Sequence, residues 1–292
     1  MKKIFYLFGF LSFGLFSCQE VNDLVLLAPP AGSYDQLTID TTKYPAVAVQ
    51  PKNVLIEDYT GDRCDNCPTA QSRSVAIVNA NPGRVSVIGI HCTDLAKPYT
   101  GYPDYRTAYG TKLMSYFFGI GGPSSLPTGA VDRLLQSFTS PPSIATPYAL
   151  WSGYVASEMA LTPKASLKIN NKSYDVGTRI LSASITTSFP NTSTDSFYVS
   201  AAVIESGFKG VQELVGSYDS NFVFEHVLRK LMYPYNGLNI ANSPSAGTTV
   251  SAKFITKLDP SWNADSCKIV AFVHHRSPLN NTVEQVQETT VK

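Results

Sequence analysis

The chain has few charged residues and almost no excess of either sign. Lys and Arg number 23 against 22 Asp and Glu, charged residues make up 15% of the 292 residues, and the formal net charge is +1. Surfaces that bind nucleic acid carry clustered positive charge, and anionic lipid also attracts basic proteins. The composition therefore predicts no nucleic-acid partner, and it does not favour electrostatic attachment to a membrane.

Long apolar runs are also missing, apart from one at the start of the chain. Residues 4–16 are apolar except for Gly and Ser, and they follow Lys2 and Lys3. This run is shorter than the roughly 20 apolar residues that a membrane-spanning helix needs. A basic segment followed by a short apolar segment is typical of a signal peptide, which we place at residues 1–17; a transmembrane helix is the alternative.

The signal peptide ends at a cysteine. Leu15, Phe16, Ser17 and Cys18 resemble the lipobox of bacterial lipoproteins, in which the cysteine becomes the acylated N-terminus. We therefore expect a lipid anchor at Cys18 that attaches the protein to a membrane. An ordinary signal peptide followed by an incidental cysteine is the alternative. Residues 18–51 show no sustained periodicity and contain a Pro-Pro pair and a Gly, which predicts a linker.

A strand, a helix and a second strand follow the linker. Residues 54–56 form a short apolar run, near-helical apolar spacing runs from Pro68 to Asn81, and residues 85–90 form another apolar run. This order predicts a βαβ unit with two parallel strands. Further helices are predicted at residues 104–118 and 148–161, so residues 52–162 form an α/β domain.

The pattern changes near residue 162. Alternating or apolar segments rich in β-branched residues follow, separated by Asn, Ser, Asp and Gly. We predict strands at residues 164–170, 180–189, 197–205, 248–254 and 268–273. Residues 163–292 are therefore predicted to form an all-β, sandwich-like domain.

The chemistry is predicted at Cys64 and Cys67, between the first strand and the first helix. A thiolate is the attacking species in disulfide exchange, and the N–H groups of a helix N-terminus stabilise it. Cys64 would be the nucleophile, and Cys67, one turn further in, would resolve the mixed disulfide. The same spacing also occurs in zinc sites, to which His91 and Cys92 could contribute in principle.

The surroundings of this pair resemble thioredoxins. Asp58 lies six positions before the first cysteine, the pair opens a helix, and Leu126-Pro127-Thr128 resembles the cis-proline loop of that fold. The resemblance implies that Asp58 assists proton transfer and that Pro127 positions the substrate backbone. Glu57 is the rival carboxylate for this role. Arg63 replaces the tryptophan that thioredoxins carry before the first cysteine, which puts a general reductase activity in doubt.

Other nucleophilic and metal-binding residues are scattered. His91 closes the second strand and could act as a proton acceptor or as a thiolate partner. Cys92 and Cys267 could pair with each other or remain separate buried thiols. His274 and His275 are adjacent in a strand and therefore point to opposite faces, so they can hardly share a metal. We predict no cofactor and no metal.

Several segments together resemble a Bacteroidetes family of outer-membrane lipoproteins named after a 28-kDa outer membrane protein. The segments are the lipobox and residues 57–68, 126–128, 131–133, 225–229, 262, 268–273 and 283–286. The resemblance implies a thioredoxin-like domain followed by a β domain, attached to the outer membrane on its periplasmic or surface face. Asp132 stands where an Asn is expected in that family.

Two functions follow from these observations. In the first, the pair Cys64 and Cys67 exchanges disulfides with thiols or disulfides of extracytoplasmic partner proteins. In the second, the protein is a non-enzymatic surface lipoprotein, an adhesin or a component of an outer-membrane complex, and the pair is a permanent structural disulfide. The accessibility of Cys64 and the pKa of its thiol discriminate between them.

Overall fold

The structure is a computed structural model that describes residues 34–292. The predicted signal peptide, the predicted lipidation site Cys18 and the first part of the predicted linker lie outside the described residues.

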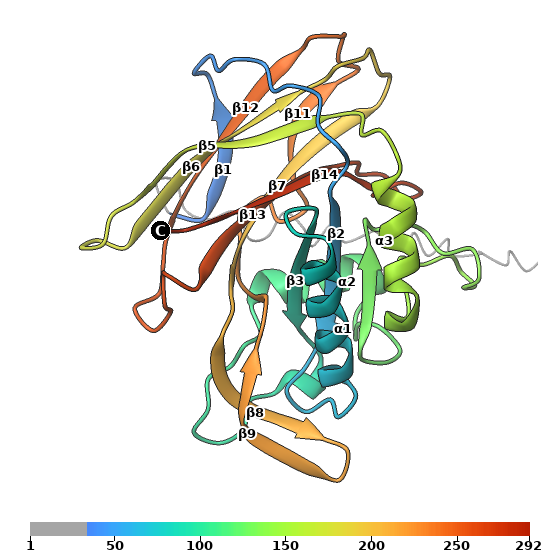
Figure 1. Cartoon of the computed structure of the whole chain (residues 1–292), viewed down its shortest axis with the longest axis vertical. Helices are drawn as coiled ribbons and strands as arrows, with labels where there is room; N and C mark the ends of the chain where they lie inside the picture. The colour runs from blue at the N-terminus through green and yellow to red at the C-terminus, as the bar shows by residue number, and fades with distance from the viewer. Residues whose placement is uncertain (1–33) are drawn as a thin grey trace, which may run out of the picture.

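Three α-helices and fourteen strands make up the described part of the chain (Figure 1). The helices are α1 (Cys67–Ala80), α2 (Ala108–Phe118) and α3 (Trp151–Met159). The strands of the first half are β1 (Gln36–Asp40), β2 (Val54–Thr60), β3 (Val85–His91) and β4 (Thr128–Val131). The strands of the second half are β5 (Ser166–Tyr174), β6 (Ile180–Ser188), β7 (Ser196–Glu205), β8 (Phe208–Leu214), β9 (Ser217–Phe224), β10 (Val227–Leu231), β11 (Leu238–Asn242), β12 (Thr249–Lys257), β13 (Cys267–His274) and β14 (Val283–Thr290).

These strands form two larger sheets and one hairpin. An eight-stranded mixed sheet has the order β14-β13-β7-β10-β3-β2-β4, with β11 also paired to β7. A four-stranded sheet has the order β1-β12-β6-β5, and β8 pairs with β9 in a separate hairpin. The strands β2 and β3 are parallel, which confirms the βαβ unit. The fold is thus rich in β-structure, with few helices.

The larger sheet contains strands from both of the predicted domains. The strand β10 lies between β7, to which it is antiparallel, and β3, to which it is parallel through the pair Val227 and Gly89. The predicted change near residue 162 falls between the end of α3 and the start of β5. One sheet therefore contains hydrogen-bonded strands from before and after residue 162.

The largest core lies between the two sheets. Leu181, Ile185 and Phe254 from the four-stranded sheet belong to the same buried cluster as Val199 and Ala271 from the larger sheet. Alternate residues of each strand face this cluster, because successive side chains of a strand point to opposite faces. Each fully buried side chain of Leu or Phe size contributes about 1.5–3 kcal/mol, so this sandwich-like layer contributes a large part of the stability.

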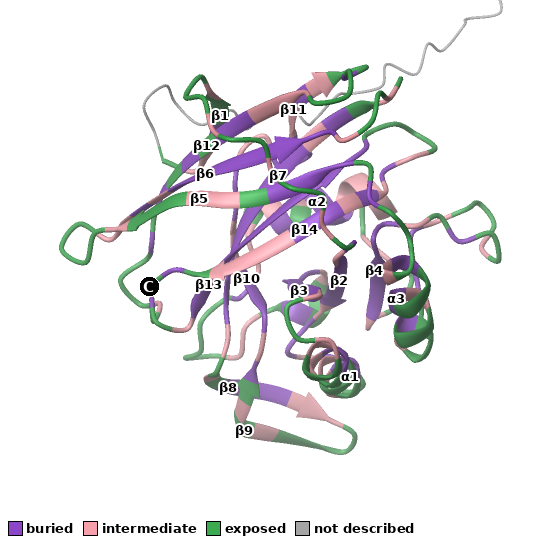
Figure 2. Ribbon diagram, turned by 45° about the horizontal axis from the view of Figure 1, so that its top comes forward, coloured by how far each residue is buried: buried purple, intermediate pink, exposed green. Residues whose placement is uncertain are grey.

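The strand β2 is buried on both faces. Val54 and Ile56 pack with α1 and α3, whereas Leu55 and Tyr59 pack on the other face with α2. Figure 2 shows β2 as buried and the outer surfaces of α1 and α3 as exposed. A strand covered on both faces has a continuous apolar sequence, which is why this strand could be predicted from its composition.

Two of the differences from the sequence predictions have a local cause. Residues 36–40, which we expected within the linker, form β1 and pair with β12; the prediction missed this strand because Leu37 is its only buried residue. The helix α2 begins at Ala108 rather than at residue 104, because the Thr107 hydroxyl accepts a hydrogen bond from the backbone N–H of Gly110 and caps the helix there.

Candidate functional site

Cys64 and Cys67 form a disulfide where β2 leads into α1. Cys67 is the first residue of α1, and its backbone N–H donates to the carbonyl of Cys64 at 3.1 Å. The N-terminal N–H groups of the helix therefore lie beside the pair, where they favour a thiolate. Both cysteines are almost fully buried, with exposed fractions of 3% for Cys64 and 2% for Cys67.

The loop before Cys64 packs tightly against the segment that follows β3. A Cβ atom at Gly61 would lie 2.4 Å from the carbonyl oxygen of Leu95, so only glycine fits there. The backbone N–H of Arg63 donates to the same carbonyl oxygen at 2.7 Å. The close approach fixes the position of the cysteine loop relative to the end of β3.

The Arg63 guanidinium is turned toward the same segment. It donates to the carbonyl oxygens of Lys97 at 2.6 Å and Pro98 at 3.0 Å, and it lies 4.2 Å from the centre of the Tyr99 ring. The Asp65 carboxylate accepts a hydrogen bond from the Asn66 amide. Both charged neighbours of the cysteines thus have partners: Arg63 binds the segment that follows β3, and Asp65 binds the adjacent Asn66.

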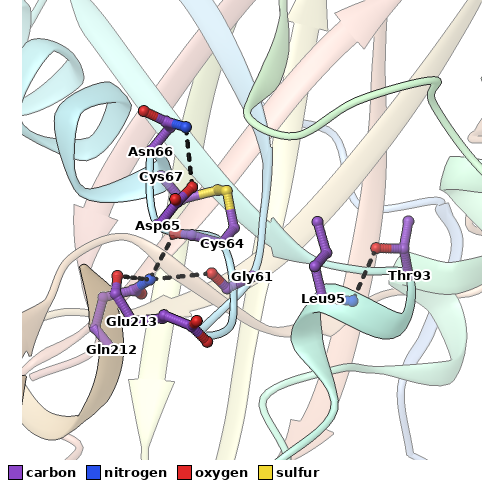
Figure 3. Close-up of a disulfide and its surroundings, with 9 residues drawn as sticks. All are labelled: Gly61, Cys64, Asp65, Asn66, Cys67, Thr93, Leu95, Gln212 and Glu213. Atoms are coloured by element: carbon purple, nitrogen blue, oxygen red, sulfur yellow. Dashed lines mark hydrogen bonds between the residues drawn. A yellow bond between two sulfur atoms is a disulfide. The ribbon is translucent and has the colours of Figure 1, made fainter. Parts of the chain in front are cut away.

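The hairpin β8–β9 contacts the loop from another side (Figure 3). The Gln212 amide donates to the carbonyl oxygens of Cys64 at 2.9 Å and Gly61 at 3.3 Å. The backbone N–H of Glu213 donates to the carbonyl of Asp62 at 2.8 Å. No local sequence pattern indicates this contact, because Gln212 follows Cys64 by 148 residues.

A cavity of about 10 Å³ lies behind the disulfide. Asp58, Cys67, His91 and Gln212 line it, and aromatic residues of β9 close it. Among residues 34–292, neither ring nitrogen of His91 has a hydrogen-bond partner, and neither does Oδ1 of Asp58. A volume of about 10–15 Å³ is the minimum for one water molecule, so the cavity has the size and the polar lining for a single water.

Asp58 is the carboxylate on the side of the disulfide. Burial raises the pKa of Asp58 from 3.8 to about 7. The neighbouring Glu57 points to the opposite face of β2, where its carboxylate is paired with the Arg133 guanidinium at 2.6 Å and 2.8 Å. The alternation of the strand thus separates the two candidate carboxylates: Asp58 shares a cavity with Cys67, and Glu57 has a partner of its own.

His91 lies in the same cavity, as the last residue of β3. Burial, followed by the charge of Arg229, lowers the pKa of His91 to about 3. Its ring packs edge-on against Tyr105 and Phe224, with ring centres 5.3 Å and 5.6 Å away. The imidazole is therefore neutral at physiological pH and carries one N–H donor and one acceptor.

Pro127 stands just before β4 and follows Leu126 through a cis peptide bond, which confirms the predicted isomer. Thr128 pairs with Tyr59 near the end of β2. Pro127 therefore lies at the edge of the sheet from which the cysteine loop departs.

The remaining cysteines are separate from this site. Cys92 and Cys267 are free, buried thiols, so the alternative in which they form a disulfide is wrong. Burial raises the pKa of each thiol to about 12. Among residues 34–292, no cluster of three or more His, Cys, Asp or Glu side chains could hold a metal ion. Two of the three cysteines of the zinc alternative, Cys64 and Cys67, are in the disulfide.

His274 and His275 have separate partners, as their positions in a strand predict. Nε2 of His274 lies 2.9 Å from the Ser200 hydroxyl, whereas Nε2 of His275 lies 2.7 Å from the Glu284 carboxylate. Each imidazole is thus engaged by a side chain of its own.

Asp132 has a structural partner that the sequence did not indicate. Its carboxylate accepts a hydrogen bond from the backbone N–H of Leu55 and pairs with the Lys52 ammonium at 2.8 Å. Both side chains are buried. The aspartate at this position therefore supplies the negative charge that balances a buried lysine.

No helix of the described residues is long and apolar enough to cross a membrane. Comparison with curated proteins gave no match. A family model described as outer membrane protein Omp28 matches residues 117–292, which is more than half of the chain.

Three solved structures are similar to the fold. HBP35 of Porphyromonas gingivalis aligns with a TM-score of 0.65 and 17% identity, covering 85% of this chain and 77% of that chain. Protein AGR_C_4864 from Agrobacterium tumefaciens aligns with a TM-score of 0.54 and 10% identity, covering 84% and 97%. A domain of the outer membrane lipoprotein Omp28 from Porphyromonas gingivalis aligns with a TM-score of 0.30 and 14% identity, covering 44% and 89%. At these identities, the first two likenesses describe the fold alone.

Proposed function

The chain belongs to the outer membrane protein Omp28 family, and on that premise we propose that Cys64 and Cys67 form a thiol–disulfide exchange centre at the outer membrane. Its partners are thiols or disulfides of extracytoplasmic proteins. Cys18 carries the lipid anchor in this proposal. The α/β part, with the pair at the start of a helix, is taken to be thioredoxin-like.

The observation that carries the proposal is the buried carboxyl of Asp58 in the cavity of Cys67. Burying a carboxyl group without a hydrogen-bond partner is costly. A permanent structural disulfide needs no titratable group beside it. A resolving thiol does, because its sulfur gains a proton when the disulfide is reduced and loses it when the disulfide forms. A pKa of about 7 for Asp58 suits a group that both donates and accepts a proton near neutral pH.

The exchange proceeds in two steps from the oxidised form. A partner thiolate attacks Sγ of Cys64, a mixed disulfide forms, and the bond between the two cysteines breaks. Sγ of Cys67 leaves with the electron pair and takes the proton of Asp58, directly or through one water. A second partner thiolate then attacks the partner sulfur of the mixed disulfide and releases Cys64 as a thiolate.

Together, these two steps transfer two electrons from the partner dithiol to the Cys64–Cys67 disulfide. The partner dithiol becomes a disulfide, and Cys64 and Cys67 become reduced. The two partner thiols give up two protons, and the reduced pair with Asp58 takes up protons according to the pH. The reverse sequence reduces a partner disulfide. In either direction, Pro127 positions the partner backbone, and the neutral ring of His91 lines the cavity of Asp58, where it can hydrogen-bond to a water molecule.

A second candidate function has an observation of its own. The small exposed fractions of Cys64 and Cys67 favour a structural disulfide in a non-enzymatic surface lipoprotein, since a buried disulfide is shielded from partner thiols. This candidate leaves the buried Asp58 without a role.

Trapping in outer membranes tests the proposal. The variant Cys67→Ser keeps the nucleophile Cys64 and removes the thiol that resolves mixed disulfides. We therefore expect it to accumulate mixed disulfides of higher mass, which dithiothreitol reduces. The matched control Cys64→Ser keeps only the inner thiol and should accumulate none. Absence of adducts from both variants would favour the structural disulfide.

A further inference from the structure

We propose that the hairpin β8–β9 is a movable cover that controls access to the Cys64–Cys67 disulfide. In the closed state, which the structure represents, the hairpin shields the pair. In the open state, a partner thiol reaches Cys64. This inference concerns the regulation of the same site and rests on the proposed function for its biological meaning, but the access it describes can be measured without assuming that function.

The first observation is that the hairpin is separate from both large sheets. The strands β8 and β9 pair with each other and with no other strand of the described residues. In Figure 1 the hairpin projects from one end of the molecule, below β3 and α1. A two-stranded hairpin is marginally stable by itself, so its position depends on its contacts with the rest of the molecule. At its base these are the aromatic cluster of Phe224 and a hydrogen bond from the Gln71 amide to the Val223 carbonyl at 2.9 Å, and nearer its turn they are the contacts with the cysteine loop.

The second observation is that two adjacent residues of β8, Gln212 and Glu213, bind the cysteine loop. The Gln212 amide, which is buried, donates to the carbonyl oxygens of Gly61 and Cys64. Next to it, the backbone N–H of Glu213 donates to the carbonyl of Asp62. These bonds join β8 to three of the four residues 61–64, the last of which is the attacked cysteine. Figure 3 shows the Gln212 side chain turned toward the loop.

A second tie runs through Tyr99. Its hydroxyl donates to Oε2 of Glu213 at 2.8 Å, and the Arg63 guanidinium lies over its ring. The closed hairpin is thus connected through one tyrosine to the residue that precedes Cys64. A hydrogen bond at a partly exposed edge can be replaced by hydrogen bonds to water at a small cost in free energy.

The third observation is the contrast between the two ends of the hairpin. At its base, Phe224 packs with Tyr105 in a buried cluster, so the base is anchored. At its turn, Val215 is 76% exposed and Tyr218 is 71% exposed. Two apolar side chains in solvent on a projecting turn offer a protein partner a means to engage the hairpin before the disulfide is reached.

The hairpin has a break of its own between its anchored base and its turn. The register of the β8–β9 pairs shifts between Gly210 and Gln212, so the ladder of hydrogen bonds is interrupted there. Bending at this point would lift Gln212 and the turn from the loop while Phe208 and Phe224 stay in the cluster at the base.

The test is the rate at which dithiothreitol reduces the Cys64–Cys67 disulfide in the full-length purified protein, followed by alkylation and mass spectrometry. We expect Gln212→Ala to be reduced about tenfold faster than the wild type, which corresponds to about 1.4 kcal/mol. Tyr99→Phe removes one hydroxyl from the second tie and should give a smaller acceleration. The matched control Asn221→Ala changes an exposed side chain of the same hairpin and should leave the rate unchanged.

Two further readouts separate opening from unfolding. Cys92 and Cys267 are buried thiols outside the hairpin, so they should stay unreactive in Gln212→Ala if only the cover opens; their alkylation at the same rate would overturn the proposal. A reduction rate within twofold of the wild type in both Gln212→Ala and Tyr99→Phe would also overturn it. The equilibrium reduction potential tests the exchange function separately, because a cover changes the rate of reduction whether or not the pair is catalytic.

Discussion

Replacing Asp58 with Asn should stabilise the protein, increasingly so as the pH rises. Asn has nearly the same shape as Asp but cannot ionise. The buried carboxyl of Asp58 has a pKa of about 7 in the folded protein against an ordinary value of 3.8. Above pH 4, the unfolded chain therefore ionises freely at this position, whereas the folded chain must either hold a proton or bury a charge.

The magnitude follows from proton linkage. The folded state binds more protons at this position than the unfolded state between about pH 4 and pH 7, so the stability of the wild type falls across this window. Each pKa unit corresponds to about 1.36 kcal/mol, and the difference of about three units gives about 4 kcal/mol as an upper limit. The unfolding free energy of Asp58→Asn minus that of the wild type should therefore grow by up to about 4 kcal/mol between pH 4 and pH 8.

The assay is urea denaturation of both proteins at several pH values. Asp132 and Asp62 also have raised pKa values, of about 7 and about 6, because of burial. Their contributions to the free energy of unfolding are present in both proteins and cancel when the wild type is subtracted from Asp58→Asn. The control is Asp175→Asn, because hydrogen bonds from the backbone and side chain of Thr178 lower the pKa of that exposed carboxylate. This carboxylate is ionised in both the folded and the unfolded chain above about pH 4, so the difference for Asp175→Asn should stay nearly constant between pH 4 and pH 8. A difference for Asp58→Asn that does not vary with pH would refute the reasoning.

Three further outcomes can be checked by standard measurements. Gly129→Ala should destabilise the protein by about 1–3 kcal/mol or more in urea denaturation, because the new Cβ atom would lie 2.3 Å from the Trp151 ring; a loss below about 0.5 kcal/mol would contradict this. Gly153→Ala, in α3 with open space around the new methyl group, should instead stabilise it by about 0.5–1 kcal/mol, and destabilisation would count against the packing described. Cys92 and Cys267, whose thiols have pKa values of about 12 through burial, should not react with Ellman's reagent at pH 8 until denaturant is added, and rapid labelling of the native protein would show that they are accessible.

Local sequence patterns predicted the part of the fold that depends on neighbouring residues. The strands β2 and β3 are rich in apolar residues because both of their faces are covered, and the cysteine pair opens the helix between them. Asp58 could be favoured over Glu57 by its offset from Cys64 alone. The structure shows that the two carboxylates lie on opposite faces of β2, and it places Asp58 in the cavity of Cys67.

Contacts between distant parts of the chain could not be predicted. The hairpin β8–β9 has a buried centre at residues 210–212 of β8 and a mostly exposed β9, and its sequence has no regular alternation of apolar and polar residues that would predict this burial. Its contact with the cysteine loop depends on Gln212, 148 residues beyond Cys64. The strand β10 was missed for a similar reason: it has only five residues, and its place between β3 and β7 is decided by tertiary pairing.

The reduction potential of the Cys64–Cys67 pair tests the central claim most directly. It can be titrated against glutathione in a variant that carries Cys92→Ser and Cys267→Ser, so that only this pair responds. A centre of disulfide exchange should have a potential between about −120 and −270 mV, the range of known oxidoreductases. A pair that stays oxidised far below about −300 mV would be a structural disulfide and would contradict the exchange function.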